Sequence, residues 1–95
     1  MYTSIRRYQV NSAAEFTRLV NEGFVPIIQN APGFIAYYGV DSGKGVWTSV
    51  SIFETEAEAD ESNRMAADFV KNHLKPLIDA GPEITVGNLV VHSTK

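Results

Sequence analysis

Arg6 and Arg7 are adjacent charged residues inside residues 2–10, a run rich in Tyr, Thr, Ile and Val that predicts a β-strand. Successive side chains on a strand point to opposite faces, so we expect the two guanidinium groups on opposite sides of a sheet. If this strand is central, one of them crosses a buried face and needs a carboxylate, a carbonyl oxygen or an anionic ligand. Arg6 is therefore a candidate catalytic group and Arg7 a candidate substrate-binding group. The alternative is a structural ion pair or an arginine at the rim of the sheet.

His73 is the second candidate for chemistry, because it falls on the apolar row of a predicted helix, four residues after Phe69 and one before Leu74. A histidine with its unperturbed pKa of about 6.5 suits general acid and base catalysis near neutral pH. The alternative is an ordinary hydrogen-bonded histidine of the core or its rim. No other histidine lies at ligand spacing, since His92 falls near the end of the last predicted strand, so we expect no metal site.

Aromatic side chains with polar tips form the third group: Tyr8, Tyr37, Tyr38 and Trp47. They suit a pocket for a flat aromatic molecule, in which phenol and indole groups act as hydrogen-bond donors. Tyr8, Tyr38 and Trp47 are the predicted substrate-binding residues of this group. Aromatic residues on strands are more often part of a core or an interface, which is the alternative.

The composition favours one globular domain over residues 1–95, with 44% hydrophobic and 20% charged residues. The net charge is −3 and the basic residues are scattered, which argues against a nucleic-acid partner. Because the chain has no cysteine, disulfides, thiolate zinc sites and a cysteine nucleophile are excluded. No apolar run approaches the roughly 18 residues of a membrane span, and we expect a cytoplasmic protein with no membrane partner.

Two capping boxes, Ser12 to Glu15 and Thr55 to Glu58, predict the starts of two helices. Gly23 and Pro26 predict a kink near Glu22 in the first helix, since proline removes one hydrogen bond of the ladder. The second helix is expected to end near Pro76 and residues 81–82. Its predicted buried residues recur at spacings of three and four: Ser62, Met65, Ala66, Phe69, Val70, His73, Leu74, Leu77 and Ile78.

Strands are predicted at residues 2–10, 34–40, 46–53 and 84–92, with turn residues at 41–45 joining the middle two as a hairpin. The order strand, helix, strand, strand, helix, strand predicts an α+β, ferredoxin-like βαββαβ fold with a four-stranded antiparallel sheet. Right-handed crossovers place the first and third strands in the centre and both helices on one face.

In the predicted strands two to four, apolar residues occur at both odd-numbered and even-numbered positions, so both faces of the sheet carry apolar side chains. An antiparallel sheet with one solvated face should instead alternate apolar and polar residues. Helices are available for only one face. The other face is therefore expected to pack against a second copy of the chain, which makes a homodimer.

Two segments resemble the antibiotic biosynthesis monooxygenase (ABM-like) family of dimeric α+β barrel proteins. Residues 31–34, with the sequence APGF, resemble the family's proline-glycine-aromatic lead into strand two, and residues 50–59 are similar to its aromatic-acidic passage into the second helix. The resemblance covers nearly the whole chain. It implies a ligand cavity between helices and sheet, and a dimer through the sheets.

The resemblance implies a small cofactor-independent monooxygenase or related enzyme acting on an aromatic or polyketide-like molecule, with no cofactor. Arg6 and His73, identified above from their own chemistry, are its candidate catalytic residues. The alternative is a non-catalytic ligand-binding or stress-related dimer. A haem-binding protein that uses His73 is a third hypothesis. Haem-degrading members share an asparagine on strand one and a tryptophan and a histidine on the second helix, and only His73 matches them here.

Overall fold

The four strands form one antiparallel sheet in the order β2-β3-β1-β4, which puts β1 and β3 in the centre as predicted. The computed structural model describes all of residues 1–95. The fold is the predicted ferredoxin-like α+β arrangement. The strands are β1 (Tyr2–Val10), β2 (Phe34–Gly43), β3 (Val46–Phe53) and β4 (Ile78–Asn88).

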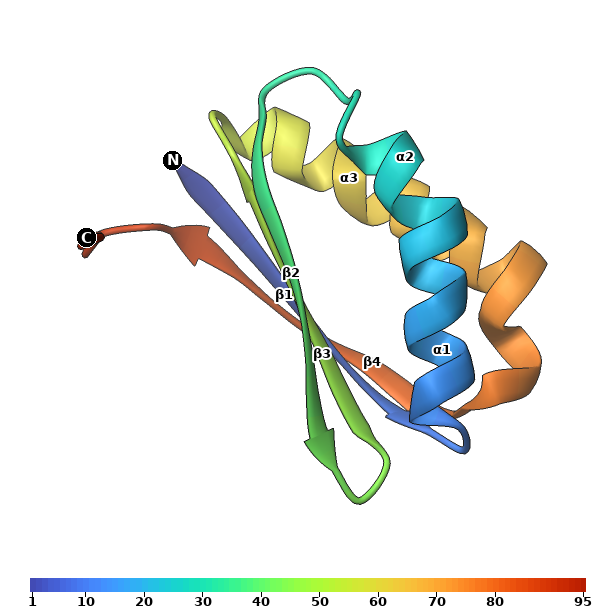
Figure 1. Ribbon diagram of the computed structural model, residues 1–95. Helices are drawn as coiled ribbons and strands as arrows, with labels where there is room; N and C mark the ends of the chain where they lie inside the picture. The colour runs from blue at the N-terminus through green and yellow to red at the C-terminus, as the bar shows by residue number, and fades with distance from the viewer.

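Two helical segments cover one face of the sheet, and the other face carries no helix (Figure 1). Each segment begins as an α-helix, passes through a π-helical turn and then reaches a proline within two residues. The first consists of α1 (Ala13–Leu19), the π turn η1 (Val20–Phe24) and α2 (Val25–Ile28). The second consists of α3 (Glu56–Phe69), the π turn η2 (Val70–Leu74) and the short 3-10 turn η3 (Lys75–Leu77).

The first π turn contains Glu22, where the sequence predicts a kink ahead of Pro26. The second was not predicted, and it corrects the expected burial of His73. A π turn takes more than four residues, so the inward-facing position after Phe69 comes one residue later than in an α-helix. Leu74 is accordingly buried, whereas His73 is exposed and its ring lies 4.8 Å from that of Phe69.

The two capping boxes have different outcomes. At the second helix, the Glu58 backbone N–H donates to Thr55 Oγ1 at 3.3 Å, which satisfies one free N–H of the first turn. At the first helix, the Ser12 side chain makes no capping hydrogen bond, and Glu15 pairs with Arg18 instead. The capping box predicted at Ser12 is therefore wrong, because the carboxylate that would complete it is held by a cation one turn away.

The last strand begins at Ile78 and ends at Asn88, so the predicted range of 84–92 is wrong at both ends. The Gly81 and Pro82 pair, expected to separate a helix from a strand, lies inside β4, where the register against β1 shifts between Arg7 and Val10. Proline is tolerated there because β4 is an edge strand.

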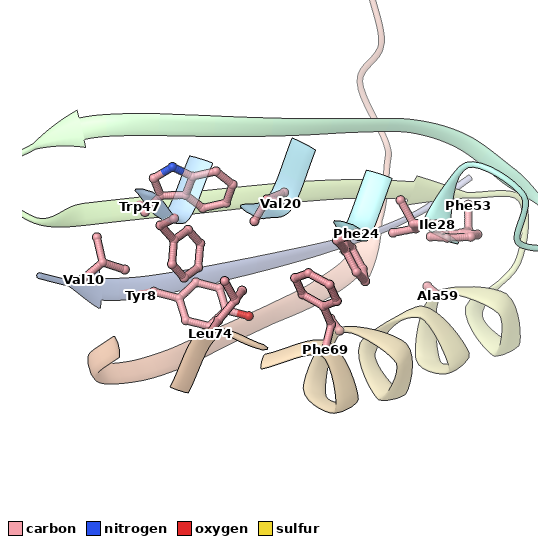
Figure 2. Close-up of a cluster of buried hydrophobic side chains, with 12 residues drawn as sticks. Tyr8, Val10, Val20, Phe24, Ile28, Trp47, Phe53, Ala59, Phe69 and Leu74 are labelled. Carbon is pink, nitrogen blue, oxygen red and sulfur yellow. The ribbon is translucent and has the colours of Figure 1, made fainter. Parts of the chain in front are cut away.

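Burial alternates along the two central strands, which separates the faces of the sheet. Even-numbered residues of β1 from Ser4 to Val10 and odd-numbered residues of β3 from Trp47 to Phe53 are buried beneath the helices. Figure 2 shows the core that forms between sheet and helices. In β2 a register shift at Ile35 puts Phe34 on the helix face with Tyr37, which corrects the simple alternation predicted for this strand.

Candidate functional site

A row of polar side chains lies buried beneath the helices, on the two central strands. Ser4 and Arg6 come from β1, and Ser49 and Ser51 come from β3. The antiparallel register pairs Ser4 with Ser51 and Arg6 with Ser49, so that the four side chains share one face. The small serine side chains leave space above the sheet around the guanidinium group.

Arg6 is only 4% exposed, yet no carboxylate lies within ion-pair distance of its guanidinium group. Its Nε donates to the Tyr8 phenol oxygen at 2.9 Å, and its Nη1 donates to Asn63 Oδ1 at 3.4 Å. Ser4 Oγ also donates to Asn63 Oδ1, at 2.6 Å. The positive charge is therefore held by neutral oxygens, and the remaining guanidinium N–H groups are available to a further acceptor.

These groups line a cavity between sheet and helices whose volume is about 20 Å³, enough for one or two water molecules. Its polar lining consists of Arg6, Tyr8, Tyr37, Ser49, Ser51, Ser62 and Asn63. Its other lining residues are apolar or aromatic: Phe16, Val20, Phe24, Trp47, Ala66, Phe69, Val70 and Leu74. The cavity is thus an apolar space with polar groups gathered at the sheet.

The aromatic walls of the cavity are held by contacts with one another. Phe16 lies between Tyr8 and Trp47, with ring centroids 5.4 and 4.8 Å away. Tyr8 and Trp47 are register partners on β1 and β3. Trp47 Nε1 donates to Thr17 Oγ1 at 2.9 Å, which fixes the indole against α1. Such fixed planar walls suit a flat ligand.

The two tyrosines of the cavity remain protonated at neutral pH. Burial raises the pKa of Tyr8, and the Arg6 guanidinium lowers it by a smaller amount. Burial also raises the pKa of Tyr37 strongly, against a smaller lowering by the Ser49 hydroxyl. Both phenols are therefore hydrogen-bonding groups and not bases, because burial penalises the charged phenolate.

Both π turns contribute to the helical side of the cavity. Val20 and Phe24 belong to η1, and Val70 and Leu74 belong to η2. π turns are rare and are frequent at functional sites, where they displace helical side chains from their regular positions. Here they decide which apolar side chains close the cavity from above.

The structure brings together three of the six predicted site residues: Arg6, Tyr8 and Trp47. Of the two arginines, Arg6 faces the cavity, whereas Arg7 lies on the opposite face and pairs with Glu83. Tyr38 also lies on the opposite face, next to Val50, and is 57% exposed.

His73, the predicted base, is exposed and does not line the cavity. Its catalytic role stays a prediction.

Asn63 is the main site residue that the sequence analysis missed, together with Ser49 and Ser51 as lining residues, whereas Tyr37 was named among the aromatic residues that suit a pocket. The sequence did contain a signal for the serines. Ser49 and Ser51 lie on the same side of a predicted central strand as Trp47 and Phe53, where apolar residues are expected. Asn63 gave no such signal, because it lies beside the predicted buried Ser62 in a polar stretch of the helix.

No group of three or more His, Asp or Glu side chains lies close enough together to hold a metal ion. No helix combines the length and the apolar character needed to cross a membrane.

No family model and no curated protein sequence matches the chain. Solved structures do match it over nearly its whole length. A protein of unknown function from Nitrosomonas europaea has a TM-score of 0.82 at 16% identity, covering 99% of this chain and 93% of that one. A monooxygenase from Streptomyces coelicolor, solved with nanaomycin D, has a TM-score of 0.77 at 15% identity, with 99% and 91% covered.

SnoaB, a cofactor-independent oxygenase from Streptomyces nogalater, has a TM-score of 0.75 at 11% identity, with 99% of this chain and 97% of that chain covered. These likenesses confirm the ferredoxin-like α+β fold that the sequence resemblance implies. At such identities they concern the fold, and the chemistry has to be argued from the site.

Proposed function

We propose that this protein is a small cofactor-independent oxygenase that acts on an ionisable aromatic molecule, with Arg6 binding the oxyanion of the substrate. One observation carries the proposal: Arg6 is buried at the wall of an aromatic cavity without a carboxylate partner. The monooxygenase and oxygenase of the same fold support it by analogy.

The buried guanidinium group favours an anionic ligand. An unpaired charge in a poorly solvated site is costly, and the neutral oxygens of Tyr8 and Asn63 compensate only part of that cost. A phenolate or enolate oxygen would supply the missing negative charge. Hydrogen bonds to charged groups contribute about 1.5–3 kcal/mol, so the same contact would lower the pKa of a bound phenol.

The cavity offers no side-chain base, since its titratable groups are Arg6 and the two tyrosines with raised pKa values. The proposed reaction therefore depends on a substrate that ionises readily beside Arg6. Its anion passes one electron to dioxygen, and the two radicals combine to a peroxide anion. This anion takes up one proton, equal to the proton released when the substrate ionised, and the resulting hydroperoxide loses water to leave a carbonyl group. The protein supplies orientation, a dry cavity and stabilisation of the anion.

Anthrone is a suitable test substrate, because it ionises to a phenolate and reacts with dioxygen to give anthraquinone and water. We expect dioxygen uptake and incorporation of isotopically labelled oxygen into the new carbonyl group. Arg6→Met should lower kcat/KM about 100-fold, whereas Arg6→Lys should retain part of the activity because it keeps the charge.

Arg18→Met is the matched control, since Arg18 is an exposed arginine of α1 that pairs with Glu15 and Glu22. It should leave kcat/KM unchanged. Turnover that is equal in the Arg6→Met and wild-type proteins would refute the proposed role of Arg6. Tight binding of anthrone without any turnover would refute the oxygenase and favour the second candidate.

The second candidate is a non-catalytic ligand-binding protein, and one feature favours it: the absence of a base from the lining of the cavity. In both candidates a bicyclic or tricyclic ligand requires the side chains above the sheet to move apart, because the cavity is only about 20 Å³. The two candidates are distinguished by whether a bound aromatic molecule is converted to a product or released unchanged.

The proposal includes a homodimer through the sheet face that carries no helix. Tyr38, Val50 and Ile5 form one row across β2, β3 and β1 on that face. Tyr38 and Ile5 are exposed there, and Val40 adds to the same surface. Packing two such faces together would remove these side chains from water.

A further inference from the structure

An open groove of about 730 Å³ runs between α3 and β4, on the helix side of the sheet. It meets the cavity at three residues that line both spaces, Arg6, Asn63 and Val70. Arg6, Asn63 and Val70 therefore form the boundary between the cavity and the groove. A ligand larger than the cavity that reaches into the groove would pass these three side chains.

The groove is basic, although the chain has a net charge of −3. Four of the eight Lys and Arg residues of the chain line it: Arg6, Arg64, Lys71 and Lys75. Arg64 is paired with Glu61 and Asp68, whereas Lys71 and Lys75 take part in no ion pair. Asp79 is the one acidic residue of the lining, and its carboxylate accepts a hydrogen bond from Asn11.

The floor of the groove is apolar. Ile84 lies opposite Arg6 on β4 and is 51% exposed, although it points to the helix face. Ile78 and Pro82 continue this surface along β4. An apolar floor with two unpaired lysines at its side fits a molecule that has an apolar body and an acidic group.

We infer that the groove is a second anion-binding subsite, which takes a carboxylate carried by the aromatic substrate while the hydroxyl of that substrate lies at Arg6. This inference rests on the proposed function, because it extends the same ligand from the cavity into the groove. It narrows the substrate class to aromatic acids that bear an ionisable hydroxyl group some distance from the carboxylate.

Two probes that differ in one group test the inference: a hydroxynaphthoate with hydroxyl and carboxylate at opposite ends, and the naphthol that lacks the carboxylate. Calorimetric titration should show that the hydroxynaphthoate binds about three- to tenfold more tightly. That advantage should shrink when salt is raised from about 20 mM to about 200 mM, because exposed charges are screened.

The double variant Lys71→Ala, Lys75→Ala should abolish the advantage of the hydroxynaphthoate and leave naphthol binding unchanged. Lys44→Ala, Lys95→Ala is the matched control, since it removes the same charge from residues that do not line the groove. If the control abolishes the advantage equally, the effect comes from net charge and the inference is wrong.

The outcomes separate the inference from the proposed function. Equal affinity for the two probes, with both weakened by Arg6→Met, would overturn the groove subsite and leave the Arg6 cavity intact. Failure of both probes to bind would overturn the ligand cavity and the subsite together. An advantage for the hydroxynaphthoate that survives in Lys71→Ala, Lys75→Ala would place the carboxylate elsewhere and would also refute the inference.

Discussion

Nη1 of Arg6 on β1 donates a hydrogen bond to Oδ1 of Asn63 on α3 at 3.4 Å, so that an amide and not a carboxylate faces the buried guanidinium group. This contact joins the sheet to the helical layer at the boundary between the cavity and the groove. It leaves the charge of Arg6 to be neutralised by something outside the chain.

Asn63→Asp should therefore place the missing negative charge inside the protein. We expect the free energy of unfolding to rise by about 1–3 kcal/mol, because an ion pair replaces a hydrogen bond between the guanidinium cation and a neutral amide. Binding of an anionic ligand should weaken at least about tenfold, because the new carboxylate competes for the same guanidinium group. Urea unfolding and ligand titration measure the two effects. Stronger ligand binding in Asn63→Asp would contradict the role assigned to Arg6.

The buried tyrosines predict a loss of stability at alkaline pH. Burial raises the pKa values of Tyr8 and Tyr37 above the value of 10.0 that a tyrosine has in the unfolded chain. The folded state then retains protons that the unfolded state has lost, so stability is fully present below about pH 10 and decreases above it. Urea unfolding between about pH 8 and about pH 11 should show this decrease, and Tyr37→Phe should reduce its slope. An unchanged slope in Tyr37→Phe would show that another group titrates.

Gly39 leaves room for the indole ring of Trp47. A Cβ atom at position 39 would lie 2.7 Å from Cη2 of Trp47, whereas a Cβ atom at Gly87 would meet nothing within 4 Å. Gly39→Ala should cost about 1–3 kcal/mol of stability through overpacking and shift the fluorescence of the single tryptophan to longer wavelength. Gly87→Ala is the control and should leave the emission unchanged. Identical spectra for Gly39→Ala and the wild type would contradict this packing.

The two helix starts predict unequal effects from equivalent mutations. Thr55→Ala removes an oxygen that accepts the Glu58 N–H and should cost about 1 kcal/mol. Ser12→Ala removes a hydroxyl that makes no capping hydrogen bond, so its cost should be clearly smaller. Thermal or urea unfolding of the two variants compares them directly. Equal destabilisation would mean that Ser12 caps its helix in solution.

The sheet face that carries no helix predicts a homodimer. A charged side chain placed in the centre of that face should dissociate the dimer. Light scattering after size exclusion should give twice the chain mass for the wild type, and Tyr38→Glu should give the monomer mass. Ile27→Glu is the control, because Ile27 is equally apolar and 47% exposed but lies on the helical layer. A wild-type monomer at micromolar concentration would refute the dimer.

Local sequence patterns were sufficient to predict much of the fold. Strand β3 has the predicted bounds, a π turn lies at Glu22 where the sequence predicts a kink, and the predicted strand order is confirmed. These features depend on neighbouring residues: alternation along a strand, proline without its N–H, and turn residues between strands. The predicted start of β4 was wrong, because a Gly-Pro pair such as Gly81 and Pro82 occurs both in turns and in irregular edge strands.

The sequence by itself determined that Arg6 and Arg7 point to opposite faces, because side chains alternate on any strand. Only the tertiary structure decided which of them enters the cavity, since that depends on where the helices pack. It likewise decided that the π turn Val70–Leu74 keeps His73 outside, and that Asn63 meets Arg6 across 57 residues of sequence. Such contacts form between distant segments, and no spacing within one segment encodes them.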